Sequence, residues 1–430
     1  MRADKISIRI LALFCLYIYP VMLKGPSLVS YLYIYGIPFV YLCLHLRSFR
    51  EVTLRQFAIL AGSLILTFFS VLYPILHGTG DLSYVVVATF VFRKLVVYLF
   101  LCIVTAKAYK DAFQMEHLML YFALTQCVFV LGTLAIVFVP GLKAAWFGVF
   151  RGAEEAEAFL KSFGYTFRIG WHGFSGFENT INCSIACIFL LYLRYRCDAG
   201  MRIGAKRFWS LYALCFLGNM FYGRSGLVVT MFASVAAVLV WERRDIPGLF
   251  KYLAAVLAGL AALVFIQKIP AFSDWFYWMS TPIKNLLTTG HFNNVSIQAT
   301  SEGVVFPGME TFLLGDGRFT AGDGYYMQTD SGLMRNLYFW GILGSALAYG
   351  VTLCAIAVTK KKARLLYLML LAAFAAFEYK GVVYCDFLAI FLAFSFAQNL
   401  KALYGRGSPA AEGPCMDRLR FEKISPVRGV

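Results

Sequence analysis

The residues best suited to chemistry gather in one polar stretch, Thr311–Gly344, which closes the longest polar interval of the sequence and runs directly into an apolar segment. Glycine is frequent in this stretch, and glycine lets the backbone turn tightly and approach a ligand closely. Acids and arginines crowded together beside an apolar segment indicate a polar site at a membrane surface rather than a packed core. The charged residues concerned are Asp316, Asp323, Asp330, Arg318 and Arg335.

A second candidate is the motif Tyr222-Gly223-Arg224-Ser225-Gly226, which separates two apolar segments. Counting from Phe208 at ~1.5 Å per residue places Arg224 about 24 Å along a helix, slightly below the outer edge of a ~30 Å hydrocarbon core. A guanidinium at that depth is costly unless it faces a wet cavity or an anion. Arg224 is therefore either a phosphate ligand, with the glycines leaving room for a diphosphate, or a turn residue whose side chain extends outward to water.

Arg168 lies in a polar run just before another apolar segment, with His172 and Glu178 nearby. A single arginine in a loop is usually solvated. We expect Arg168 on the same outer face as Arg224, and this convergence makes it a candidate ligand for the same anion.

Arg93 and Lys94 lie near the middle of an apolar segment, where charged side chains are functional candidates by default. The acids available to them are Asp386 and Glu378. Adjacent helical residues project about 100° apart, so one cation can serve a site while the other serves packing. An ion pair that joins helices and a ligand contact both fit these residues.

Several kinds of site are absent from the sequence. It contains no HExxH motif, no CxxC motif and no paired metal-ligand spacing. The stretch GDGRFTAGDG is rich in glycine but lacks the lysine and the preceding strand of a nucleotide-binding P-loop. We therefore expect no metal, nucleotide or other cofactor.

The composition predicts the scaffold that holds these residues. Of the 430 residues, 60% are hydrophobic and only 14% are charged, far from the soluble average. Apolar windows near the ~20 residues of a spanning helix recur along the chain, and they lack the alternation of a membrane β-barrel. We predict an all-α polytopic membrane protein with about twelve spanning helices, near 8–23, 28–46, 57–75, 83–106, 117–139, 179–194, 208–222, 226–241, 250–267, 336–358, 366–378 and 383–399.

Lys and Arg are distributed unevenly between the intervals that join these segments. With a cytoplasmic N-terminus, the cytoplasmic intervals carry most of them, whereas the short outer turns hold little more than Lys24, Arg224 and Lys380. This bias explains the net charge of +16, so nucleic acid is not expected as a partner. It also predicts a membrane domain over 1–401 with both termini cytoplasmic, extracytoplasmic loops at about 140–178 and 268–335, and a basic cytoplasmic tail over 402–430. Trp275 and its aromatic neighbours predict a helix in the second loop, either at the membrane interface or as a packed lid.

With these features the chain resembles the Wzy-type O-antigen or capsular polysaccharide polymerases of the O-antigen ligase/polymerase superfamily. The resemblance rests on the number of helices, the two unequal outer loops, Gly-Arg-Ser-Gly at 223–226 and LLGDG…TDSGLMRNLYFWGILG at 313–344. It implies a GT-C-like fold in the bacterial inner membrane. It also implies an enzyme that moves a growing glycan from one undecaprenyl diphosphate onto an incoming lipid-linked repeat unit, at the periplasmic face and without metal. A chain-length regulator and a flippase would be its partners.

The resemblance also suggests roles for particular residues. Arg224 and Arg168 would hold the diphosphate, and Asp330 would lie nearest the reacting sugars. The interval before LLGDG lacks an arginine that relatives carry, and Arg318 is the candidate substitute. Arg93 and Arg335 are further candidate contacts. A His-Asn pair that is frequent in the related O-antigen ligases is absent here, which favours a polymerase.

Glycosyl transfer needs a base for the acceptor hydroxyl and cations for the departing diphosphate. Asp330 is the candidate base, and Glu310, Asp323 and His172 are the reserves. Asp330 could equally cap the helix that follows it. A polysaccharide flippase or secondary transporter is the alternative function, because transporters place charges such as Arg93 and Lys94 along their pathway. The long loop at 268–335 argues against a transporter.

Overall fold

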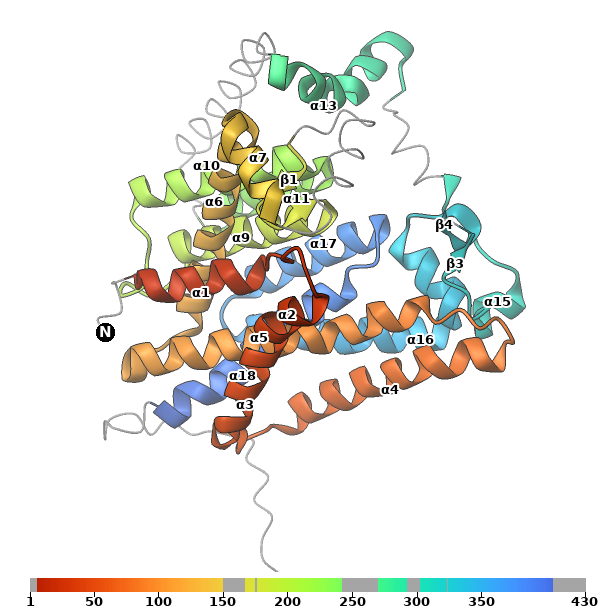
Figure 1. Cartoon of the computed structure of the whole chain (residues 1–430), viewed down its shortest axis with the longest axis horizontal. Coiled ribbons are helices and arrows are strands. Elements are labelled where there is room, and N and C mark those ends of the chain that lie inside the picture. Colours follow the sequence, from red (N-terminus) through yellow and green to blue (C-terminus); the bar gives the residue numbers. More distant parts are fainter. Residues whose placement is uncertain are drawn as a thin grey trace, which may run out of the picture.

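A computed structural model describes residues 6–149, 167–174, 176–241, 270–291, 302–322 and 324–404 (Figure 1). Within these ranges the chain is almost entirely helical, and its strands form only two short hairpins, β1–β2 and β3–β4. The elements are α1 (Ile8–Ile18), α2 (Ser27–Tyr31), the π-helix η1 (Leu32–Gly36), α3 (Ile37–Leu44), η2 (Leu46–Phe49), α4 (Leu54–Leu76), α5 (Ser83–Tyr109), η3 (Lys110–Ala112), α6 (Met115–Phe138), α7 (Pro140–Val149), β1 (Ile169–Gly170), β2 (Gly173–Phe174), α9 (Phe177–Tyr195), α10 (Ala205–Tyr222), α11 (Arg224–Trp241), α13 (Pro270–Thr289), α15 (Met309–Leu314), β3 (Thr320–Ala321), β4 (Gly324–Tyr325), η4 (Tyr326–Gln328), α16 (Gly332–Ile356), η5 (Ala357–Lys361), α17 (Arg364–Lys380) and α18 (Tyr384–Tyr404).

The fold class predicted from composition is confirmed as an all-α fold of membrane type. Within the described ranges, six helical stretches are long and apolar enough to cross a bilayer: Ser27–Leu44, Leu54–Leu76, Ser83–Ala112, Met115–Phe138, Arg224–Trp241 and Gly332–Lys361. Other predicted segments also coincide with helices, namely α1, α9, α10, α17 and α18. Segment 250–267, Asp323 and most of the tail 402–430 lie outside the described residues.

Two helices form the centre of the bundle. In α9, every residue from Asn179 to Leu193 is buried, and α18 is buried almost throughout from Val383 to Ala397. α18 packs mainly against α5 and α16, while α9 packs against α6, α10 and α11. The centre of the bundle also buries polar residues of α9, namely Asn179, Thr180, Asn182 and Ser184.

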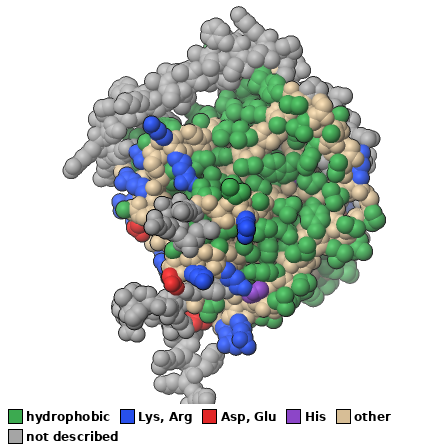
Figure 2. Space-filling view, turned by 60° about the vertical axis from the view of Figure 1, so that its left-hand side comes forward, with side chains coloured by type: hydrophobic (Ala, Val, Ile, Leu, Met, Phe, Trp, Pro, Cys, Tyr) green, Lys and Arg blue, Asp and Glu red, His purple; other side chains and the backbone are tan. Residues whose placement is uncertain are grey.

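The outer helices carry exposed apolar side chains instead. Examples are Phe39 on α3, Phe68 on α4 and Phe232 on α11, whose exposed fractions are 58%, 64% and 73%. Figure 2 shows apolar side chains spread broadly over one face of the molecule. Exposure on this scale is typical of a surface that contacts lipid rather than water.

The helix α16 is broken at Gly341, where φ is 65° and ψ is −169°. The break leaves carbonyl groups of the first half without helical partners, and the loop after α15 supplies them. Asp316 N donates to the carbonyl of Tyr338 at 2.6 Å and Gly317 N donates to that of Phe339 at 3.2 Å. A Cβ on Gly341 would lie 2.3 Å from the Leu313 carbonyl oxygen, so only glycine permits this contact. The two halves of Thr311–Gly344 therefore form one interlocked unit.

The second predicted loop contains the expected helix, α13, which packs on the protein through aromatic side chains. Trp275 is 2% exposed, and its Nε1 donates to the Met220 carbonyl at 3.1 Å. Its ring lies 5.9 Å from that of Phe167 and 5.8 Å from that of Phe221. These contacts pack α13 against the end of α10, and its position relative to the membrane interface stays a prediction.

Candidate functional site

Arg168 and Arg224 converge on one tryptophan of α13. The guanidinium carbon of Arg224 lies 4.6 Å from the ring centroid of Trp278, and that of Arg168 lies 5.0 Å from the same centroid. Arg224 Nη1 also donates to the Trp278 carbonyl at 3.1 Å. Both guanidinium groups therefore make cation–π contacts with one aromatic ring. The sequence expectation that these two arginines share one face agrees with this geometry.

Lys380 is the third cation of this cluster, and it was not among the candidates chosen from sequence. It ends α17, beyond the apolar stretch 366–378. The pKa of Lys380 is lowered to about 8, mainly by burial and in part by the charges of Arg168 and Arg224, while the charge of Asp330 opposes the shift. Arg168, Arg224 and Asp330 therefore each lie within electrostatic range of Lys380. One feature of the sequence could have identified Lys380 as a candidate: it is one of the few cations in the predicted outer turns.

The elements that carry these residues meet at one point. A Cβ on Gly332, at the start of α16, would lie 2.4 Å from the Gly381 carbonyl oxygen. A Cβ on Gly381 would lie 2.9 Å from the ring of Phe177, at the start of α9. The close approach brings the first turn of α16 and the last turn of α17 beside α9. Asp330 and Lys380 are thereby held together, although 50 residues separate them.

The glycines of the 223–226 motif have a different role from the one predicted. A Cβ on Gly223 would lie 2.6 Å from Thr180 Oγ1, and a Cβ on Gly226 would lie 2.4 Å from Thr180 Cγ2. The expectation that these glycines leave room for a diphosphate is therefore wrong, because α9 already fills that space. Because glycine has no side chain, the backbone that joins α10 to α11 can pack tightly against α9 at these two positions. Ser225 Oγ is buried and has no hydrogen-bond partner among the described residues.

Asp330 is exposed, and it precedes α16 without capping it. The N-cap of α16 is Ser331, and no side chain there caps the helix. The alternative that Asp330 is the N-cap is therefore wrong. Its carboxylate is accessible beside Lys380, which is the geometry a proton acceptor needs.

The other residues predicted in this loop serve its internal structure or face solvent. Arg335 is 9% exposed, with its guanidinium 3.5 Å from the ring centroid of Tyr325 and 4.0 Å from that of Phe319. Arg318 is exposed and lies near Tyr326, and Glu310 is exposed in the first turn of α15. Among the described residues, the contacts of Arg318 and Glu310 do not reach Arg168, Arg224 and Trp278 (the Trp278 cluster), whereas Arg335 lies within electrostatic range of Asp330.

Asp81, between α4 and α5, anchors the polar loop to the bundle and was missed in the sequence. Its Oδ2 accepts hydrogen bonds from Phe319 N and Thr320 N, both at 2.7 Å, and its Oδ1 accepts from Ser83 N at 3.0 Å. Partial burial opposes ionisation of the Asp81 carboxyl, but the hydrogen bonds from Ser83, Thr320 and Phe319 outweigh it and lower the pKa. Thr79 Oγ1 adds a hydrogen bond to the Gly317 carbonyl at 2.8 Å. An isolated aspartate in a short turn carries no sequence signal for such a contact.

Asp81→Asn is expected to loosen residues 316–321 by about 1–3 kcal/mol, because the amide loses the charge that strengthens these hydrogen bonds. Hydrogen exchange of the amides of Phe319 and Thr320 measures the effect. Since the pKa of Asp81 is lowered on folding, wild-type protection is complete above the ordinary aspartate pKa of about 3.9 and falls only in stronger acid. Asp111→Asn, at the exposed η3 turn, is the control. Equal protection in both variants would exclude the anchor.

Lys94 forms a buried ion cluster that the sequence predicted in part. Its Nζ lies 2.5 Å from Glu178 Oε1 and contacts Asp386 Oδ1 as well. Asp386 was a predicted partner, whereas Glu178 was expected near Arg168. Glu378, the other predicted partner, instead accepts hydrogen bonds from Asn336 at 2.9 Å and from Val383 N at 2.8 Å.

Arg93 and His172 lie close to this ion cluster rather than to the Trp278 cluster. Arg93 Nη2 donates to the Val86 carbonyl of its own helix at 2.9 Å. His172 packs on the rings of Tyr19 and Phe129, at centroid distances of 5.3 Å and 5.1 Å. Burial lowers the pKa of His172 to about 4, Glu178 opposes the shift, and Lys94 adds to it. The imidazole is therefore neutral at pH 7.

No known protein family matches this chain, and no curated protein matches it significantly. In the described residues Arg168 and Arg224 lie against Trp278, and Lys380 is within electrostatic range of both arginines and of Asp330. Three cations and one accessible acid can bind a polyvalent anion and accept a proton next to it.

Proposed function

We propose that the protein is a polymerase of lipid-linked oligosaccharides, which joins repeat units into O-antigen or capsular polysaccharide. The observation that carries the proposal is the convergence of Arg168 and Arg224 on Trp278, with Lys380 and Asp330 beside them. A diphosphate needs several fixed cations, and a glycosyl acceptor needs a base within reach. The resemblance to Wzy-type polymerases rests on the same Gly-Arg-Ser-Gly motif and on the loop that ends in Asp330.

In the proposed reaction, the acceptor sugar hydroxyl of one lipid-linked unit attacks the anomeric carbon of the glycan on another. The bond between that carbon and the diphosphate oxygen breaks, and undecaprenyl diphosphate leaves with the electron pair. Asp330 takes the hydroxyl proton. Arg168, Arg224 and Lys380 stabilise the negative charge on the leaving diphosphate. The phosphoester linkage already activates the donor, so no nucleotide is required.

The proposed setting is the bacterial inner membrane, with twelve spanning helices and both termini in the cytoplasm. The bias of Lys and Arg toward one set of intervals supports this orientation. It puts the Trp278 cluster at the periplasmic face, where undecaprenyl-linked repeat units would arrive from a flippase. A chain-length regulator would act on the product.

A secondary transporter or flippase is the second candidate, and the ion cluster of Lys94, Glu178 and Asp386 favours it. Charged clusters inside a membrane domain often line a proton or substrate pathway. The same cluster can instead join α5, α9 and α18, since it contributes one residue from each. An O-antigen ligase would use the same diphosphate site with a different acceptor.

Deletion of the gene in its bacterium separates these functions. On a gel of surface glycans, we expect the ladder of repeat units to collapse to a single unit, and plasmid-borne wild-type protein to restore it. Loss of every repeat unit would instead indicate a ligase or flippase. A normal ladder in the deletion strain would refute all three functions.

A further inference from the structure

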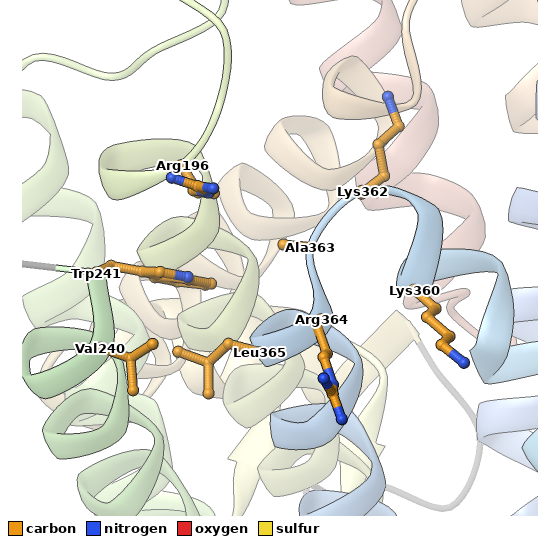
Figure 3. A pocket seen from close by; sticks show the side chains of 8 residues that line it. All are labelled: Arg196, Val240, Trp241, Lys360, Lys362, Ala363, Arg364 and Leu365. Atoms are coloured by element: carbon orange, nitrogen blue, oxygen red, sulfur yellow. The ribbon is translucent and has the colours of Figure 1, made fainter.

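A cavity of about 440 Å³ opens at the end of α11 opposite to Arg224 (Figure 3). We call it the basic cavity. α11 runs from Arg224 to Trp241, so at ~1.5 Å per residue this cavity lies about 25 Å from Arg224 along the helix, close to the thickness of a bilayer core. The cavity is therefore a separate feature from the Trp278 cluster. It is lined by Arg196, Val240, Trp241, Lys360, Lys362, Ala363, Arg364 and Leu365.

Three cations of the basic cavity, Arg196, Lys360 and Arg364, are available for an anion. In the part of the chain that the structure describes, their side chains have no ion-pair or hydrogen-bond partner. Lys362 differs, because its Nζ lies 2.8 Å from Glu116 Oε1 on α6. In Figure 3 the Lys362 side chain points away from those of Lys360 and Arg364. Lys362 therefore neutralises the charge of Glu116, and the other three cations are not needed for that pairing.

The start of α17 adds a second attraction for an anion. α17 begins at Arg364, its N-cap is Ala363, and its first turn contains no acidic residue. An alanine side chain cannot accept a hydrogen bond, so it leaves the first N–H groups of the helix uncapped. The positive end of the helix dipole is therefore directed toward the same cavity. Both residues line the cavity wall.

The remaining wall is apolar and joins a surface of membrane type. Val240 and Leu365 lie beside Trp241 in Figure 3, and indole rings favour the headgroup level of a bilayer. Val240 is 46% exposed. From this point a series of exposed apolar side chains runs back along α11, with the spacing of one helix face: Leu239, Val235, Phe232, Met231 and Val228. A molecule held here would have a charged group on the cations and an apolar part along α11.

We infer that the basic cavity binds the phosphate headgroup of an anionic phospholipid, with the acyl chains along α11. Arg196 and Arg364 would bind the phosphate oxygens, for which a guanidinium is well shaped, and Lys360 would add charge. Basic pockets between helices at the cytoplasmic end of membrane proteins recognise such headgroups. The cation-rich interval around Lys360 assigns this end to the cytoplasm. The inference does not depend on the proposed function.

Native mass spectrometry of the full-length protein in neutral detergent tests the inference. Phosphatidylglycerol is titrated against phosphatidylcholine, and retained lipid is counted. We expect wild-type protein to retain phosphatidylglycerol selectively. Each cation near a membrane surface contributes about fivefold, so a triple variant, Arg196→Gln, Lys360→Gln and Arg364→Gln, should bind about 100-fold more weakly. The charge-preserving triple Arg196→Lys, Lys360→Arg and Arg364→Lys should remain within about tenfold of wild type.

The control is a second triple variant with equal loss of charge, Arg47→Gln, Arg50→Gln and Lys206→Gln. These three cations are exposed and lie outside the basic cavity, so selectivity should persist. If both neutralised triple variants bind phosphatidylglycerol equally weakly, the proposed site is refuted, because general surface charge would then explain the binding. Displacement of the lipid by millimolar inorganic phosphate would identify a soluble anion as the ligand instead. If the neutralised cavity triple does not fold, unselective lipid retention by wild-type protein would still refute the proposal.

Discussion

Asp330→Asn is expected to reduce glycan polymerisation by about 10²–10⁴-fold, the usual cost of removing a general base. Asn has nearly the same shape and an equally good hydrogen-bond acceptor, but it cannot take a proton from the acceptor sugar. A structural role is a weak competitor, because Ser331 occupies the N-cap of α16 and the Asp330 side chain is exposed. The measurement is the length distribution of lipid-linked glycan made by purified protein, at equal amounts of folded enzyme.

Asp316→Asn is the matched control for this change. Asp316 lies in the same loop, but its carboxylate accepts hydrogen bonds from Thr311 Oγ1 at 2.7 Å and Tyr326 OH at 3.1 Å. Its loss should therefore affect stability more than chemistry. Substitution of the reserve bases tests the alternative assignment. If Asp330→Asn makes full-length polymer and one of Asp323→Asn, Glu310→Gln or His172→Ala makes none, the base is that residue and not Asp330.

Arg224→Lys is expected to reduce polymerisation by about ten- to a hundredfold, because a lysine keeps the charge but loses the planar pair of N–H donors. Hydrogen bonds to charged groups are worth about 1.5–3 kcal/mol each, which corresponds to this range. Arg224→Ala should be more severe, since it also removes the stacking on Trp278. The effect should be a weaker affinity for the lipid diphosphate, measured by titrating a short-chain prenyl diphosphate.

Arg224 also donates to the Trp278 carbonyl, so its loss could act by displacing α13. Lys284→Ala controls for charge on α13, because Lys284 is exposed and its ammonium lies over the ring of Tyr277, at 5.9 Å. Trp278→Leu controls for position, because it keeps the backbone carbonyl and removes the aromatic face. Unchanged diphosphate affinity in Arg224→Ala, with lowered thermal stability, would show that Arg224 only supports α13.

The helices of this protein could be predicted from local sequence. Long apolar runs satisfy their backbone hydrogen bonds only as helices in lipid, so α4, α5, α6, α11 and α16 follow from hydropathy. Arg224 and Arg168 could also be selected, because a cation beside an apolar run is costly without a partner.

What could not be predicted was how residues distant in the chain pair with one another. Lys94 meets Glu178 and Asp386 through three helices, and its predicted partner Glu378 turns toward Asn336 instead. Adjacent charged residues on a helix give no information about which neighbouring helix each one faces.

The sequence alone therefore determined a helical membrane scaffold, a polar loop ending at Asp330 and two arginines of interest, because each depends on residue type and local spacing. The tertiary structure decided the site itself. Trp278 brings Arg168 and Arg224 together, the contact of Gly332 with Gly381 sets Asp330 beside Lys380, and Thr180 fills the space beside Gly223 and Gly226. These contacts join residues about 40 to 110 positions apart, and they arise from the packing of helix ends, which no local period in the sequence encodes.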